Sequence, residues 1–277
     1  MTRAQALRYA RTRLEEAGFP SRQAEAEARQ LLEHLTGEHG ARFWRGAPLE
    51  LEPGQQRRLE AALARRTAGE PLQLILGTAV FYGLELEVRP GVLVPRPETE
   101  RLVELALAEL PEDRPARVLD VGTGSGAIAL ALKRARPALE VYASEVSGGA
   151  LELARANARR LGLEVTFLHA PLTAGLARLD LIVSNPPYLP EAYRDEAPPE
   201  LAWEAAEALY AGADGLAVAR PLLAEAAAAL AGGGGLLLEL DPTNVHALAR
   251  EARQAGFTEV AVLPDLAQRP RFLRARR

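Results

Sequence analysis

The chain has 277 residues, 48% of them hydrophobic, so it can bury the core of one full α/β domain and a smaller second domain. The 33 basic and 37 acidic side chains leave a net charge of −4, which argues against a dedicated nucleic-acid-binding protein because phosphate neutralisation requires clustered positive charge. The absence of cysteine excludes disulfides and cysteine-bound zinc. No apolar run approaches the roughly 20 residues of a membrane span, and no signal peptide is visible, so we expect a cytoplasmic enzyme without a membrane partner.

Residues 1–70 predict a small domain made of helices. Apolar residues recur at helical spacing and stop at Gly18. A second helix, which Ser21 could cap, is expected to end before Gly37, and a third helical pattern begins after Pro53. We expect this helical domain to dock a substrate.

Residues 71–98 predict a linker built around a β-hairpin. An alternating run over residues 84–88 follows the aromatic stretch 80–83, as in two strands joined by a tight turn. The prolines of the segment 95–100 end any strand there, because proline cannot donate to a sheet. A helix is expected to begin within that segment.

Residues 99–277 predict a domain of alternating strands and helices. We expect strands at 117–121, 140–144, 165–168, 179–184, 236–240 and 259–263, and helices at 127–135, 150–161 and 221–230. Repeated strand and helix units imply an α/β fold with a mainly parallel, Rossmann-like sheet covered on both faces. Ligands of such sheets bind beyond the carboxyl ends of the strands, where two motifs of this sequence fall.

The first motif is the glycine-rich loop Gly122-Thr123-Gly124-Ser125-Gly126, which joins a strand to a helix. Its glycines let the backbone turn tightly and approach a ligand closely, and the helix offers free N–H groups to a carboxylate or a phosphate. The third glycine comes one residue earlier than in the dinucleotide-binding fingerprint, and a nicotinamide dehydrogenase is the competing interpretation. A tight turn without a ligand is the structural alternative.

Glu145 ends the next strand, about 20 residues after the loop, where a carboxylate can accept both hydroxyls of a ribose. An ordinary surface carboxylate is the alternative interpretation. The loop and Glu145 together predict a site for a nucleoside-bearing cofactor.

The second motif, Asn185-Pro186-Pro187-Tyr188, follows a strand of buried type. Because the prolines lack N–H donors, the Asn185 side-chain oxygen and the Pro186 carbonyl are left to accept the two hydrogens of a substrate NH₂ group, and Tyr188 offers a flat face for stacking. This arrangement suits methyl transfer from a sulfonium, since such a donor is already activated and the protein mainly has to hold the nitrogen in line. No general base is nominated. The alternative is a rigid turn that ends a strand.

The histidines and tryptophans give weaker indications of a functional site. The four histidines, at positions 34, 39, 169 and 246, have spacings that suit no metal site. His169 lies at the end of an expected strand and is predicted to be a core residue. Trp44 and Trp203 are expected to pack, and Trp203 could also shape a substrate groove.

With these motifs the chain resembles the release-factor glutamine methyltransferases over nearly its whole length. The similarity is carried by residues 70–73, 75–77, 81–83, 90–100, the glycine loop and 184–188. The Pro-Arg-Pro-Glu-Thr-Glu run at 95–100 is the most restrictive segment, since Asn-Pro-Pro-Tyr also occurs in adenine and guanine amino-methyltransferases. The resemblance implies a class I methyltransferase sheet that uses S-adenosylmethionine to methylate the side-chain amide nitrogen (N5) of the Gly-Gly-Gln glutamine in bacterial class 1 peptide chain release factors.

The resemblance also implies a role for each motif residue. Asn185, Pro186 and Tyr188 would be the catalytic residues, and the glutamine would be bound by Asn185, Pro186, Pro187 and Tyr188. The donor would be held by Gly122, Thr123, Gly124, Ser125, Gly126, Glu145 and Asn185. Phe81 and residues 96–98 would lie near the mouth of the site.

The sequence departs from the family pattern at three places. Glu145 replaces the usual Asp, and Glu204-Ala205 replaces a usual Glu-Pro. Ala170 and Pro171 stand where an acidic and an apolar residue commonly flank the adenine. The adenine contacts are therefore left without assigned residues.

Two other functions stay open at this point. A DNA or RNA exocyclic-amine methyltransferase would need a basic base-flipping groove and usually a recognition domain, neither of which the sequence shows. A catalytically inactive binding protein of the same fold would have lost its activity at Ala170 and Pro171, and it would fail to bind S-adenosylmethionine.

Overall fold

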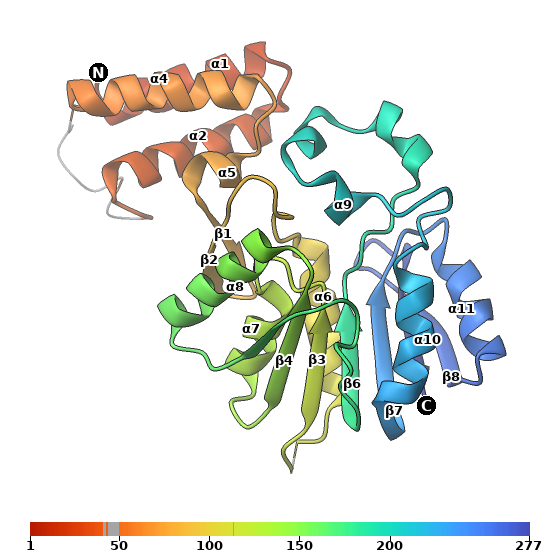
Figure 1. The fold of residues 1–277 in the computed structure, drawn as a ribbon. Coiled ribbons are helices and arrows are strands. Elements are labelled where there is room, and N and C mark those ends of the chain that lie inside the picture. Colours follow the sequence, from red (N-terminus) through yellow and green to blue (C-terminus); the bar gives the residue numbers. More distant parts are fainter. Residues whose placement is uncertain (41–42, 44–49, 113) are drawn as a thin grey trace. The chain divides into compact units, whose positions relative to one another are not determined.

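The computed structural model describes residues 1–40, 43, 50–112 and 114–277. Within this range the chain divides into two compact units, Met1–Gly77 and Thr78–Arg277 (Figure 1). Trp44, expected to pack, lies outside the described residues.

The first unit is helical. It contains α1 (Arg3–Glu16), α2 (Ser21–Thr36), α4 (Pro53–Thr67) and the short α5 (Leu72–Leu76). Their apolar faces share one core, with Leu14, Leu31, Leu32, Leu59 and Leu63 among its buried residues. The predicted cap at Ser21 is wrong, because Ser21 is the first helical residue and Pro20, which has no side-chain donor or acceptor, occupies the cap position.

A buried ion pair also joins α2 to α4. The guanidinium of Arg66 donates to both carboxylate oxygens of Glu27, at 2.6 Å and 3.0 Å, and lies over the ring of Phe19. Both charged residues are less than 9% exposed. Breaking such a pair leaves an uncompensated buried charge, so removal of either partner alone is destabilising.

The second unit begins with a β-hairpin and continues as a seven-stranded sheet. The hairpin pairs β1 (Thr78–Phe81) with β2 (Leu84–Glu87). The sheet contains β3 (Arg117–Val121), β4 (Glu140–Glu145), β5 (Thr166–His169), β6 (Leu179–Ser184), β7 (Leu230–Glu239), β8 (Thr258–Pro264) and β9 (Pro270–Arg276), in the order β5-β4-β3-β6-β7-β9-β8. Strands β3 to β7 pair in parallel, whereas β9 is antiparallel to both of its neighbours.

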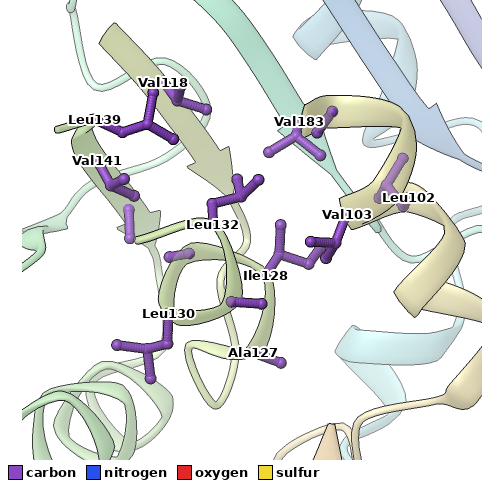
Figure 2. Packing of buried hydrophobic residues seen from close by; sticks show 14 of the residues in the cluster. Leu102, Val103, Val118, Ala127, Ile128, Leu130, Leu132, Leu139, Val141 and Val183 are labelled. Carbon is purple, nitrogen blue, oxygen red and sulfur yellow. The ribbon is translucent and has the colours of Figure 1, made fainter. Parts of the chain in front are cut away.

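Helices cover both faces of this sheet (Figure 1). One face carries α6 (Pro97–Glu109), α7 (Ala127–Ala135) and α8 (Gly148–Leu161), and the other carries α10 (Ala219–Ala229) and α11 (Val245–Gln254). Successive strand residues point to opposite faces, so Val118 joins the first core and Leu119 the second. Figure 2 shows Ile128 of α7 pointing toward Val103 of α6 within the first core.

The strand order changes direction between β3 and β6. From β3 the chain runs outward through β4 to β5, and it then returns to place β6 on the other side of β3. The crevice beyond the carboxyl ends of β3 and β6 is the expected ligand site of such a sheet. The predicted α/β, Rossmann-like fold with an N-terminal helical region is confirmed, although α11 and β9 were not predicted.

Candidate active site

The glycine-rich loop joins β3 to α7 with all three glycines in the left-handed region, at φ values of 68° for Gly122, 56° for Gly124 and 87° for Gly126. A Cβ at Gly126 would come within 3.0 Å of Leu130 and 3.3 Å of the Ala154 Cβ, so glycine here allows α7 to pack against α8. A Cβ at Gly122 would meet no described atom within 4 Å. The loop backbone therefore faces open space in which a ligand can approach it.

Glu145, at the end of β4, is bound to this loop. The Gly124 N–H donates to its Oε2 at 2.9 Å, and the N–H groups of Val146 and Ser147 donate to its Oε1 at 2.9 Å each. An ionised carboxylate offers about four lone-pair sites, so one remains for a further donor. A grip on both hydroxyls of a ribose, as the sequence predicts, requires one of the three backbone bonds to open.

Asp120 supports the loop from within β3, a role that sequence reasoning missed. It is fully buried, and its Oδ2 accepts from the Thr123 hydroxyl at 2.6 Å and from the Ala129 N–H at 3.2 Å. Its Oδ1 has no partner among the described residues. Burial raises the pKa of Asp120 to about 7, although both hydrogen bonds act in the opposite direction. A lone acidic residue in an apolar strand was the available signal.

The raised pKa of Asp120 predicts a pH-dependent stability. The folded-state pKa of Asp120 lies above the ordinary value of 3.8, so the protonated carboxyl stabilises the fold. This stabilisation is complete below pH 3.8 and is lost as pH rises through about 7. Asp120→Asn keeps an acceptor but cannot ionise, so we expect its free energy of unfolding to fall less than that of wild type between pH 5 and 8, as measured by denaturant titration. Parallel pH profiles of the two proteins would contradict this assignment.

The second motif begins at the carboxyl end of β6. Pro186 is buried, whereas Asn185, Pro187 and Tyr188 are half-buried. The Asn185 Nδ2 donates to the hydroxyl of Thr99 at 3.1 Å, and its buried Oδ1 has no partner within the part of the chain that the structure describes. Burial of a polar atom without a partner is costly, so this oxygen is available to accept a hydrogen bond from a ligand.

The side chain of Tyr188 contacts the guanidinium of Arg271. The Arg271 guanidinium is 5.1 Å from the centre of the Tyr188 ring, and its Nη2 donates to the phenol oxygen at 3.2 Å. Burial and the neighbouring Glu239 raise the pKa of Tyr188 well above its usual range, despite Arg271. The phenol therefore stays neutral at physiological pH and supplies a ring face, not a phenolate.

The backbone carbonyl of Tyr188 is fixed by two further residues, Asn244 and Gly215. Asn244, just before α11, donates from Nδ2 to the Tyr188 carbonyl at 2.9 Å and to the Asp214 carbonyl at 3.1 Å. Gly215 lies so close that a Cβ there would be 2.1 Å from the Tyr188 carbonyl oxygen. Neither residue was singled out from the sequence.

The Pro-Arg-Pro-Glu-Thr-Glu segment contacts the motif through Thr99 and the segment around Glu204 through Arg96. Thr99 binds Asn185, and Arg96 forms a close ion pair with the buried Glu204, whose other oxygen accepts from the Val94 N–H at 3.2 Å. Burial raises the pKa of Glu204, and Arg96 opposes that change. Ala205 adopts φ −65°, the value that a proline would fix, so alanine keeps the backbone conformation of the usual Glu-Pro.

The positions expected to flank an adenine lie beside Glu145. The Ala170 N–H donates to the Glu145 carbonyl at 3.1 Å, and Pro171 is exposed. The prediction that His169 is a core residue is wrong, because it ends β5 as an exposed side chain with Nε2 2.9 Å from the Val146 carbonyl. Trp203, expected to pack, is 38% exposed.

Two family models match the chain. Residues 98–225 match the methyltransferase small domain, and residues 5–77 match the PrmC N-terminal domain. Among solved structures, the hMettl16 catalytic domain in complex with MAT2A 3'UTR hairpin 6 is similar with a TM-score of 0.57 at 15% identity, over 82% of either chain. This likeness concerns the fold alone, and it supports the class I methyltransferase sheet.

Curated relatives match nearly the full length. A protein named release factor glutamine methyltransferase from Deinococcus radiodurans is 52% identical over 272 residues, which cover 98% of this chain and 97% of that protein. A protein of the same name from Cereibacter sphaeroides is 42% identical over 281 residues, covering 100% and 99% respectively.

Proposed function

The chain belongs to the family of release factor glutamine methyltransferases, and from this premise we propose that it methylates the side-chain amide nitrogen of the Gly-Gly-Gln glutamine in bacterial class 1 peptide chain release factors. S-adenosylmethionine is the methyl donor. The observation that carries the proposal is the buried Oδ1 of Asn185, which lacks a partner among the described residues and lies at the switch point of the sheet. An acceptor of this kind suits an NH₂ group.

Bound S-adenosylmethionine supplies an electrophilic methyl group on a sulfonium. The residues proposed to hold it are Glu145 and the loop Gly122-Thr123-Gly124-Ser125-Gly126, whose open backbone and nearby carboxylate suit a nucleoside joined to an amino acid. Asn185 borders both the donor and the substrate.

The glutamine amide is proposed to bind Asn185-Pro186-Pro187-Tyr188. Its two hydrogens are accepted by the Asn185 Oδ1 and the Pro186 carbonyl, and its plane stacks on the Tyr188 ring. Donating both hydrogens increases the electron density on the weakly nucleophilic amide nitrogen. The same two hydrogen bonds hold the nitrogen in line for attack on the methyl group. Once the nitrogen carries the methyl group, it becomes more acidic and releases one of its protons readily. No strong base is therefore needed.

Glu145→Gln is expected to weaken the binding of S-adenosylmethionine about tenfold or more. The glutamine amide would place an NH₂ donor against backbone N–H groups that now donate to the Glu145 carboxylate. The loop would also lose its charged partner. Calorimetry with S-adenosylmethionine measures the change. Glu152→Gln, an exposed position on the neighbouring helix α8, is the matched control and should bind as wild type does. Equal affinity of both variants would remove Glu145 from the donor site.

The release factor assignment is tested by methyl transfer from labelled S-adenosylmethionine. A class 1 release factor should accept label, and the same factor with its Gly-Gly-Gln glutamine replaced should not. Equal labelling of both proteins would overturn the proposal. Label in DNA or RNA would favour the exocyclic-amine alternative, and absence of donor binding would favour an inactive protein.

We further propose the organisation predicted from the sequence, with residues 1–70 docking the release factor, 71–98 linking, and 99–277 carrying out the transfer. Among the described residues, none of the helices is long and apolar enough to cross a membrane. Because translation terminates in the cytoplasm, we expect the enzyme to act there, with release factors and not nucleic acid as its partners.

A further inference from the structure

The backbone at Tyr188 is fixed, but the backbone alone does not set the plane of its ring. The Tyr188 carbonyl accepts from the Asn244 Nδ2 at 2.9 Å, and the two prolines before it have a restricted φ. These restraints leave the side-chain torsions of Tyr188 free, and the torsion that turns an aromatic ring has a broad minimum. A ring that stacks on a planar amide needs a defined plane, so a further contact must set it.

Arg271, near the start of β9, makes that contact. Its Nη2 donates to the Tyr188 hydroxyl at 3.2 Å, and its guanidinium carbon lies over the ring, 5.1 Å from the ring centre. A cation over an aromatic face is attracted to the ring when it lies within about 6 Å of the centre. The hydrogen bond restrains the far end of the side chain and the cation restrains its face, so together they restrict the ring to one orientation.

The guanidinium of Arg271 is itself held beside the end of β7. Its Nε lies 3.7 Å from Oε1 of the buried Glu239, and its Nη1 lies 3.9 Å from Oδ2 of Asp241. Between these carboxylates the Leu240 N–H donates to the Arg271 carbonyl at 2.9 Å. The Arg271 side chain is only 14% exposed. The Tyr188 ring is therefore connected to β7 and β9, which continue the sheet beyond the strand that carries the motif.

We propose that Arg271 is a positioning residue that sets the plane of the Tyr188 ring and thereby the plane in which the substrate amide meets the methyl donor. The inference rests on the proposed function. The guanidinium occupies one face of the ring and leaves the opposite face for stacking. A ring that can rotate would hold the amide in several orientations, few of them in line with the methyl group, so turnover should fall while donor binding stays the same.

The first test replaces Arg271 with side chains that differ in charge and shape. Arg271→Lys keeps a positive charge near Glu239, but one ammonium lacks the planar fork that serves the hydroxyl and the carboxylates together. We expect kcat on a release factor to fall about threefold to tenfold for Arg271→Lys and about tenfold to hundredfold for Arg271→Met. Calorimetry should show unchanged affinity for S-adenosylmethionine. Wild-type kcat in either variant, or an equal loss of donor affinity, would overturn the inference.

A cycle with Tyr188→Phe tests whether the two residues act as a pair. This variant keeps the ring and removes only the hydroxyl that Arg271 binds, so kcat should fall about threefold or more. If the hydroxyl acts through Arg271, Tyr188→Phe should have no further effect in the Arg271→Met background. Losses that multiply would mean that the hydroxyl and the guanidinium act independently, which contradicts the proposed role.

Arg274→Met controls for the loss of an arginine from β9. Arg274 donates to Glu109 of α6 at 3.3 Å, and its replacement should leave kcat unchanged. Thermal midpoints identify a variant that does not fold. If Arg271→Met fails to fold because Glu239 is left without a counter-charge, the cycle is run with Arg271→Lys, and multiplying losses again overturn the inference. A wild-type protein that labels no release factor would instead reject the proposed function.

Discussion

Asn185→Ala is expected to reduce kcat on a release factor by about 10² to 10³, the loss seen when one preorganised hydrogen-bonding group is removed from an active site. Within the described residues the side chain makes one hydrogen bond, to Thr99, so its loss should cost only about 1 kcal/mol of stability. Turnover with labelled donor and the midpoint of thermal unfolding measure the two effects.

Asn157 of α8 provides the matched comparison for Asn185. It is fully buried and makes three hydrogen bonds, two with the Glu87 backbone and one to the Ser125 carbonyl. Asn157→Ala should therefore lower the thermal midpoint more than Asn185→Ala does. If Asn185→Ala instead unfolds the protein, Asn-Pro-Pro-Tyr is a structural turn.

Gly215→Ala is expected to have the largest effect on the shape of the site. The new Cβ would lie 2.1 Å from the Tyr188 carbonyl oxygen and 2.6 Å from the Asn244 Nδ2, at a φ of 76° that alanine rarely adopts. The turn must move, so we expect a loss of roughly 2–4 kcal/mol in the free energy of unfolding. A displacement on the order of 1 Å at a catalytic group can cost about 10²-fold in kcat.

Gly256→Ala separates the clash at Gly215 from backbone strain. Gly256 has a φ of 87°, yet a Cβ there would meet nothing within 4 Å. We expect this variant to lose about 1 kcal/mol of stability and to keep its kcat. Denaturant titration and turnover should therefore distinguish the two glycines. Similar values for both variants would show that Gly215 does not determine the position of Tyr188.

The sequence was sufficient for most of the sheet because its central strands are apolar runs between helices, as in Leu179–Ser184. It was insufficient for β9, whose first residue is proline and whose arginines at 271, 274 and 276 hide a strand that lies between two others. Helix α11 was missed although Val245, Leu248, Ala249 and Ala252 have helical spacing and are all buried.

For the site, the sequence showed the motif residues but not what supports them. Thr99 is 86 residues from Asn185, and Asn244 is 56 residues from the Tyr188 carbonyl that it binds. Such pairs form only when the strand order brings distant segments to one edge of the sheet. His169 was misjudged because apolar neighbours suggested burial, whereas β5 is an edge strand whose last residue is exposed.

The insertion of β9 between β7 and β8 has a consequence for biosynthesis. While the nascent chain is shorter than about 270 residues, β7 has a free edge beside its apolar residues Leu236 to Leu238, and such edges recruit other strands. The cation beside Tyr188, Arg271, is also missing at that stage. A chain that ends before β9 should therefore aggregate more readily than the full chain, because the edge of β7 stays unpaired.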